Sequence, residues 1–247
     1  MSVLAEVIDD LVTGSRILAA EGICDAFGHV SARHPDRDDR FLLARAQPPE
    51  LVEHDDIMEF ELDGTPVGDD GRKPFLERFI HGALYAARED VRSVVHSHSH
   101  SVIPFTVTEA KLRPLLHSSA VLGKDVPVWD AQTTFGDTNL LISSNEMGED
   151  FAEVLDSGTC ALMRGHGSTV VGRSVREAVY TAVYLEVNAK LQISASSLGE
   201  IKHLTDGEID LIQSRLADAK PGEGYDRAWQ FWCRRAGMAH TAAGSAT

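Results

Sequence analysis

Apolar residues recur three and four positions apart near both ends of the chain, and this spacing predicts amphipathic helices. Residues 3–21 place their apolar side chains on one stripe, and Gly22 follows as a C-terminal stop. Residues 174–198 give the clearest helical pattern, with a stripe of valines and alanines. Ser174 and Glu177 match the S-x-x-E capping box, so we expect this helix to begin there.

Between these helices the pattern changes to short apolar runs that are bounded by turn residues. Residues 46–74 are rich in Pro, Gly and Asp, which indicates loops around short strands. The segment after Pro74 has helical apolar spacing and predicts a helix over 75–88. The remaining predicted elements are strands within 26–35, 40–45, 57–62, 91–98 and 160–174, and a last helix over 206–219. Strands mixed irregularly with helices predict a layered α/β fold.

Composition narrows the range of functions. The chain has 247 residues, 43% of them hydrophobic, and this size fits one compact domain or at most two small ones. Its formal net charge of −15 argues against nucleic-acid or anionic-membrane partners. The three cysteines form no C-x-x-C pair, and the N-terminus lacks a secretory pattern. No long apolar run predicts a membrane span, so we expect a cytoplasmic protein.

The segment "VVHSHSH" places histidines at alternate positions behind a run of valines. On a strand, His96 and His98 share one face and lie about 6 to 7 Å apart, a span that one divalent ion can bridge. An H-x-H pair alone is more often the solvated end of an ordinary strand. Other residues must therefore decide whether a metal site is present.

Two further features favour a metal site. His166 stands in a Gly-His-Gly turn, which exposes its ring and lets its backbone approach another element. Glu77 lies near the start of the helix that leads into the H-x-H strand. Taken singly, the turn is a common one and Glu77 fits a solvent-facing position. Together, three imidazoles and one carboxylate form a common set of metal ligands. Glu77 either occupies the fourth coordination position or leaves it to the substrate.

These motifs in combination resemble the class II aldolase/adducin family over residues 5 to 200. The shared features are E-x3-H at Glu77 and His81, the H-x-H pair nineteen residues after Glu77, the G-H-G turn and the capped helix. The resemblance implies a single-domain layered α/β/α fold with a central, mainly antiparallel sheet, over residues 1–240, followed by a disordered tail over 241–247. It also implies a homotetramer with active sites at the subunit interfaces.

The same resemblance assigns the metal ligands. His96, His98 and His166, with Glu77, would hold one divalent ion per subunit, whereas His100 has no required role. Zinc, manganese, iron and cobalt all suit such a shell.

The sequence departs from the phosphate-binding pattern of the sugar-phosphate aldolases in this family. His29 replaces the asparagine of their G-N-x-S turn, and the loop "LLARAQPPE" lacks their Ser-Gly pair. Phe75 and Leu76 stand where serines precede the glutamate. Because a phosphate needs several N–H or O–H donors, we expect a flat, unphosphorylated molecule that carries carboxylates.

Several polar residues are predicted to bind this substrate. His29, Ser31, Arg45 and Arg78 are the candidates near the predicted site, and Tyr225 is a further one from the C-terminal segment. The alternative is that the arginines form surface ion pairs and that the neighbouring aromatic residues pack in the core.

The residues around these motifs are similar to those of one branch of the family, which decarboxylates aromatic acids. This branch contains the hydroxy-methylpyridine-dicarboxylate and dihydroxyphthalate decarboxylases. The similarity implies a metal-dependent decarboxylase of a hydroxylated aromatic or pyridine (di)carboxylic acid, chelated through a carboxylate and the adjacent hydroxyl. Glu77 is the first candidate for the acid that protonates the ring carbon. His117 and Tyr225 are alternatives that could act from a neighbouring subunit, although His117 also fits a packed core or interface histidine. Trp229 and Trp232 are expected to be packing residues.

Other functions remain open. An aldolase acting on an unphosphorylated hydroxy-keto acid would use the same metal and Glu77, and would differ in its product. An adducin-like binding module would have lost catalysis, but retention of all four candidate ligands argues against it. A cupin needs a glutamate shortly after H-x-H, whereas the next one here is Glu109.

Overall fold

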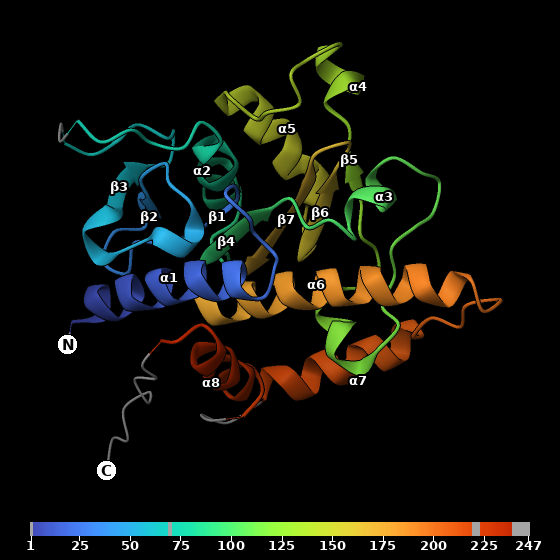
Figure 1. The fold of residues 1–247 in the computed structure, drawn as a ribbon. Helices are drawn as coiled ribbons and strands as arrows, with labels where there is room; N and C mark the ends of the chain where they lie inside the picture. The colour runs from blue at the N-terminus through green and yellow to red at the C-terminus, as the bar shows by residue number, and fades with distance from the viewer. Residues whose placement is uncertain (1, 69–70, 219–222, 239–247) are drawn as a thin grey trace.

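The computed structural model describes residues 2–68, 71–218 and 223–238, and within them the strands form one seven-stranded sheet (Figure 1). The strand order is β3-β2-β1-β4-β7-β6-β5. Neighbouring strands pair antiparallel except β5 and β6, which pair parallel. The strands are β1 (His29–Arg33), β2 (Arg40–Ala44), β3 (Ile57–Glu61), β4 (Ser93–Ser97), β5 (Val128–Trp129), β6 (Cys160–Met163) and β7 (Gly167–Gly172).

Helices cover both faces of this sheet (Figure 1). Helices α1 and α6 lie along one face, and α2 and α5 pack together on the other. Helices α7 and α8 add a further layer beyond α6. The helices are α1 (Val3–Ala20), α2 (Arg78–Ala87), α3 (Ile103–Thr106), α4 (Ala131–Phe135), α5 (Asn145–Leu155), α6 (Val175–Ser196), α7 (Asp206–Ala217) and α8 (Tyr225–Arg235), with short 3₁₀ segments η1 (Pro49–Leu51), η2 (His54–Asp56) and η3 (His117–Leu122). The predicted single-domain α/β/α fold with a mainly antiparallel sheet is confirmed.

The central strands are apolar on both sides because each face of the sheet carries a helical layer. In β4, Val94 belongs to the core under α2 and α5, and Val95 belongs to the core under α1 and α6. In β7, Val170 and Val171 divide between the two cores in the same way. The alternation of side chains along a strand therefore supplies both cores from a continuous apolar run.

Helix α2 is held in close contact with its surroundings. A Cβ on Gly82 would overlap the carbonyl of Leu62, and a Cβ on Gly148 of α5 would overlap the carbonyl of Phe79. Glycine at these two positions lets α2 approach the loop after β3 on one side and α5 on another. This close packing fixes the helix that carries part of the functional site.

The predicted elements over 3–21, 75–88, 174–198 and 206–219 are confirmed as α1, α2, α6 and α7, although α2 begins at Arg78. Helices α5 and α8 were not predicted. Helix α5 does carry an amphipathic pattern, with Met147, Phe151 and Leu155 on one face, which the sequence interpretation missed. The apolar residues of α8 are mixed with arginines. Trp229 and Trp232 are buried in the core, as expected of packing residues. The predicted tail over 241–247 lies outside the described residues. None of the described helices is long and apolar enough to span a membrane.

The start of α6 differs in one detail from the predicted capping box. The Ser174 hydroxyl accepts the Glu177 N–H at 3.2 Å, as the motif predicts. The Glu177 carboxylate, however, accepts the N–H of Arg173 at 2.9 Å instead of that of Ser174. The N-cap is therefore present, while the reciprocal bond is displaced by one residue.

We predict that Ser174→Ala lowers the free energy of unfolding by about 1 kcal/mol, because the first turn of α6 loses its N-cap acceptor. The control is Ser194→Ala on the exposed side of the same helix, which should change stability by less than about 0.5 kcal/mol. Urea denaturation followed by circular dichroism measures both values. Equal effects of the two substitutions would contradict a capping role for Ser174.

Candidate metal centre

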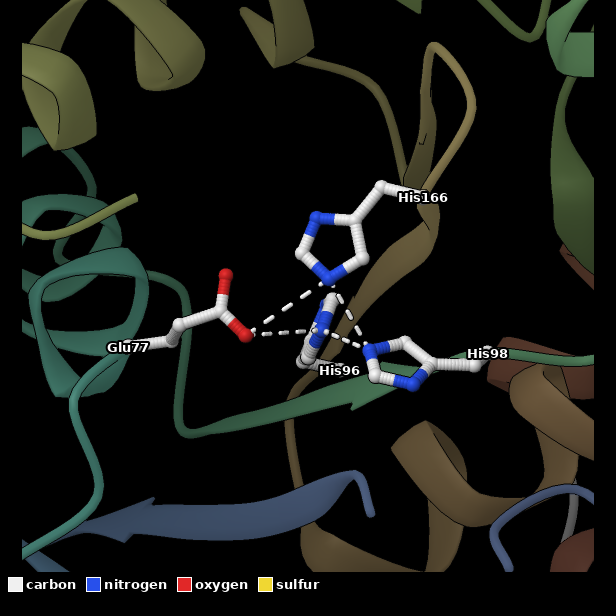
Figure 2. Close-up of side chains that lie close together, drawn as sticks. All are labelled: Glu77, His96, His98 and His166. Atoms are coloured by element: carbon white, nitrogen blue, oxygen red, sulfur yellow. Dashed lines mark hydrogen bonds and ion pairs between the residues drawn. The ribbon is translucent and has the colours of Figure 1, made fainter. Parts of the chain in front are cut away.

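The four predicted ligands converge from three parts of the fold (Figure 2). His96 lies on β4 and His98 follows directly after that strand. His166 lies in the turn between β6 and β7, and Glu77 is the residue before the first turn of α2. Because β4 and β7 are neighbours in the sheet, the H-x-H pair and the G-H-G turn meet at one end of the sheet. The start of α2 then brings the carboxylate to the same point.

Distances between the ligand atoms fit a single ion. Nε2 of His98 lies 3.1 Å from Nε2 of His96 and 2.9 Å from Nε2 of His166. Oε2 of Glu77 lies 3.5 Å from His96 Nε2 and 3.6 Å from His166 Nε2. Four atoms bonded tetrahedrally at about 2.0–2.1 Å lie about 3.3 Å apart. The donor set therefore matches a zinc-like divalent ion in both chemistry and spacing.

Glu77 is held in its ionised form. Its side chain is buried, and its Oε1 accepts the backbone N–H of Ile142 at 3.2 Å. Burial alone would raise the pKa of Glu77, but His96, His166 and the Ile142 N–H outweigh it and lower the pKa to about 2. An ionised carboxylate is the form that binds a cation.

Two of the histidines, His98 and His166, have lowered pKa values. Burial, together with the neighbouring imidazoles, lowers the pKa of His98 to about 4. Burial also lowers the pKa of His166, with His96 adding to the effect. Neutral imidazole is the form that binds a metal, so the site is prepared for an ion.

The loop before α5 also supports the site. Leu140 adopts a left-handed backbone conformation with φ of 66°, which a leucine takes only under constraint from its neighbours. Its carbonyl partly offsets the lowering of the His166 pKa. Two residues later, the Ile142 N–H reaches Glu77. One short loop therefore acts on two of the four ligands.

The structure gives a physical reason for the G-H-G motif. Gly165 has φ of 64°, so the turn requires the left-handed conformation that glycine adopts without strain. Gly167 begins β7, where a Cβ would overlap the carbonyl of Ser97 and press on the backbone of His98. The two glycines bring the His166 backbone to the end of β4.

Aromatic rings border the ligand cluster. His29 pairs with His96 across β1 and β4, and their ring centroids lie 5.2 Å apart. Phe75 packs on His29 at 4.4 Å. Phe27 is 64% exposed and lies 6.3 Å from the His98 ring. The predicted apolar surroundings are therefore present, and the sequence interpretation missed Phe27.

Ser31 is placed differently from the prediction. Its hydroxyl is fully buried, 2.6 Å from Nδ1 of His81 and 2.7 Å from the Tyr85 hydroxyl. A side chain enclosed in this way does not contact substrate directly. The sequence interpretation gave His81 and Tyr85 no role, although they follow Glu77 at successive intervals of four residues and so share its helical face.

The two predicted arginines are engaged elsewhere. Arg45 forms an ion pair with Asp56 at 2.6 Å. Arg78 donates to the carbonyls of Gly64 and Phe75 at 2.6 and 3.0 Å, and its guanidinium lies over the Phe79 ring. For Arg45 the ion-pair alternative of the sequence analysis is therefore the one observed. The donors of Arg78 stabilise the loop between β3 and α2, and its assignment as a substrate ligand stays a prediction.

Tyr225 and His117 also lie away from the cluster in the same chain. The Tyr225 hydroxyl donates to Glu177 at 3.1 Å, near the end of β7 opposite to His166. Since β7 has six residues, this end lies roughly 20 Å from the metal centre. His117 is exposed at the start of η3. Tyr225 therefore does not reach the cluster of its own subunit, and His117 is not among the residues that form it.

The fold and the site define the class of the protein. Residues 9–193 match the family model "Class II Aldolase and Adducin N-terminal domain", so the chain belongs to this family. Among solved structures, the L-fuculose 1-phosphate aldolase of Glaciozyma antarctica superposes with a TM-score of 0.76 at 24% identity, covering 95% of this chain and 91% of that chain.

Curated relatives narrow the class further. The chain is 34% identical over 242 residues to decarboxylase tropJ of Talaromyces stipitatus, covering 90% of this chain and 91% of the relative. It is 26% identical to the 3,4-dihydroxyphthalate decarboxylase of Arthrobacter keyseri, covering 87% of this chain and 88% of the relative. The predicted family resemblance is confirmed, and these relatives indicate a lyase of a metal-dependent family.

We predict that Gly167→Ala weakens zinc binding by about tenfold or more, because the added methyl group separates the ends of β4 and β7. Competition with a chromogenic chelator measures the affinity. Gly207→Ala in α7 is the control, since a Cβ there meets no atom within 4 Å. Unchanged zinc affinity in a folded Gly167→Ala protein would contradict the close-approach argument.

We also predict that the metal-free protein loses stability as the pH falls from about 6.5 to about 4. The folded state lowers the pKa of His98 to about 4, so in this window the unfolded chain binds more protons and the free energy of unfolding rises with pH. Urea unfolding at several pH values should show a smaller loss for His98→Gln than for the wild type. The exposed His117→Gln variant should follow the wild type, and equal slopes for all three proteins would refute the prediction.

Proposed function

We propose that the protein is a metal-dependent decarboxylase of a hydroxylated aromatic or pyridine carboxylic acid. The observation that carries the proposal is a complete four-ligand centre bordered by Phe27 and Phe75. Aromatic rings in this position suit a flat substrate. The residues that bind phosphate in the sugar-phosphate aldolases are replaced at the corresponding positions of this sequence. Similarity to relatives that are named decarboxylases supports the same reaction class.

The three histidines and Glu77 would hold the ion, and this ligand type suits zinc, manganese, iron and cobalt alike. A divalent cation bound there supplies the charge that stabilises the electron pair left on the ring when CO2 departs. The substrate would bind through its carboxylate and the adjacent hydroxyl. The rings of Phe75 and Phe27 would orient its plane and exclude water.

Glu77 is proposed to move one proton. Because its pKa is about 2, the resting carboxylate is ionised and cannot itself begin as an acid. It can accept the proton of the substrate hydroxyl and then return that proton to the ring carbon from which CO2 has left. The substrate thus supplies the proton that the product needs, and Glu77 ends in its starting form.

The remaining predicted residues fit this scheme only through other subunits. In the proposed homotetramer, Tyr225 and His117 would serve the site of a neighbouring chain, since Tyr225 does not reach the cluster of its own chain and His117 is not among the residues that form it. His29 is proposed to bind a substrate oxygen. A cytoplasmic location and the absence of nucleic-acid partners remain expectations from composition.

An aldolase acting on an unphosphorylated hydroxy-keto acid is the second candidate. The same ligands and the aldolase fold of a solved neighbour favour it. Aldol cleavage gives two carbonyl compounds, whereas decarboxylation gives CO2, so product analysis separates the two reactions.

We predict metal-dependent CO2 release from aromatic acids that carry an ortho hydroxyl. Chelated and metal-reconstituted protein would be given hydroxylated phthalates, hydroxypyridine dicarboxylates and hydroxy-keto acids, with CO2 and carbonyl products measured. Glu77→Gln should lower turnover by at least about 100-fold, because the amide cannot carry the proton. The control is Glu89→Gln, an exposed position just beyond the other end of α2.

The metal content of the Glu77→Gln protein must be measured alongside its turnover, since Glu77 is also a ligand. Loss of turnover with metal retained supports the proton-transfer role, and unchanged turnover removes Glu77 from the mechanism. Carbonyl products without CO2 would replace the decarboxylase with the aldolase.

A further inference from the structure

A chain of buried hydrogen bonds runs from α2 through β1 to the edge of the metal centre. The Tyr85 hydroxyl lies 2.7 Å from Ser31 Oγ, and Ser31 Oγ lies 2.6 Å from Nδ1 of His81. Nε2 of His81 lies 2.7 Å from Nδ1 of His29. His29 in turn lies beside His96. All four members of the chain are buried, and Tyr85, Ser31 and His81 are at most 1% exposed.

Counting protons fixes the direction of these bonds. Each hydroxyl has one proton, and each bond needs one. If the bonds ran from His29 toward Tyr85, the Tyr85 hydroxyl proton would need an acceptor of its own. Among the described residues, Ser31 is the partner of that hydroxyl by hydrogen-bond geometry, so this direction leaves a buried donor unpaired at a cost of about 1–3 kcal/mol.

The opposite direction satisfies every group. Tyr85 donates to Ser31, Ser31 donates to Nδ1 of His81, and His81 donates from Nε2 to Nδ1 of His29. Nδ1 of His29 is then an acceptor, so a neutral His29 carries its proton on Nε2. A mixed arrangement with both Tyr85 and His81 donating to Ser31 fails, because the Ser31 proton would have no acceptor.

We propose that His81, Ser31 and Tyr85 are positioning residues that hold His29 with an N–H group at Nε2, available to an anionic oxygen of the substrate beside the metal centre. The substrate assignment rests on the proposed function, whereas the tautomer does not. Within the described residues Nε2 of His29 has no hydrogen-bond partner, and His29 keeps 6% of its surface exposed.

A fixed N–H group at Nε2 of His29 affects which substrate oxygen binds there. A fixed donor stabilises a carboxylate or phenolate oxygen, which only accepts hydrogen bonds, and disfavours a group that must donate. The ring stands between His96 and Phe75, so the donor lies where a planar acid would place an oxygen next to its metal-chelating group. The donor would thus bind the ionised acid more strongly than its neutral alcohol or amide analogues, because a hydrogen bond to a charged acceptor is the stronger one.

Nitrogen-15 NMR of the histidine side chains in the zinc-loaded protein tests the tautomer directly. The His29 signals are assigned by their loss in His29→Gln. The wild type should show His29 protonated at Nε2 and unprotonated at Nδ1. A His29 ring protonated at Nδ1 alone would overturn the inference, and this measurement needs no further variant.

Three serine variants test whether the chain sets the tautomer. Ser31→Ala removes the donor to His81 and should give a mixture of His29 tautomers, whereas Ser31→Thr keeps the hydroxyl and should restore the wild-type spectrum. The matched control is Ser93→Ala, which removes a buried bond to the backbone carbonyl of Ser31 but leaves the chain intact. An unchanged His29 tautomer in Ser31→Ala would refute the positioning role.

Binding of 2-hydroxybenzoate to the zinc-loaded protein, measured by calorimetry, tests the use of the donor. His29→Phe should weaken binding about tenfold or more, and Ser31→Ala by a few-fold, with zinc content unchanged. Equal affinity of His29→Phe and the wild type would overturn the binding role of His29. If the wild type does not bind this acid, the proposed function fails, while the NMR result still decides the tautomer.

Discussion

Three imidazole nitrogens and one carboxylate oxygen meet in a buried space, and much of the structure serves to hold them there. His98 faces two other Nε2 atoms at 2.9 and 3.1 Å, but its single ring proton can satisfy only one of them. Without a cation, this arrangement leaves lone pairs opposed to one another. A divalent cation removes this repulsion, because each lone pair can then bind the positive charge of the ion.

The sequence predicted the ligands better than it predicted the substrate site. H-x-H spacing, the glycines around His166 and the place of Glu77 before a helix are local patterns, and local patterns determine which residues reach one end of the sheet. The substrate assignments depended on tertiary partners that no local pattern shows. Arg78 donates to a carbonyl of the preceding loop, and the Ser31 hydroxyl bonds to His81 of α2 instead of facing the metal centre.

The secondary structure was also predicted only in part. Helices α1 and α6 were predicted, whereas α5 was missed although its residues Met147, Phe151 and Leu155 share one helical face. The packing of helix α5 is visible only in the tertiary structure, where Gly148 fits against the backbone of α2. A signal for His81 and Tyr85 did exist, because both continue the helical face of Glu77, but its meaning depends on Ser31 lying opposite.

The common face of Glu77, His81 and Tyr85 has an evolutionary consequence. One helix carries a metal ligand and two members of the hydrogen-bond chain, and its glycine contacts leave it little freedom to rotate. A substitution that turns α2 would shift the ligand and the His29 donor together. Relatives with new substrates should therefore diversify in the loops around Phe27 and Phe75, where the chain can vary without moving the helix.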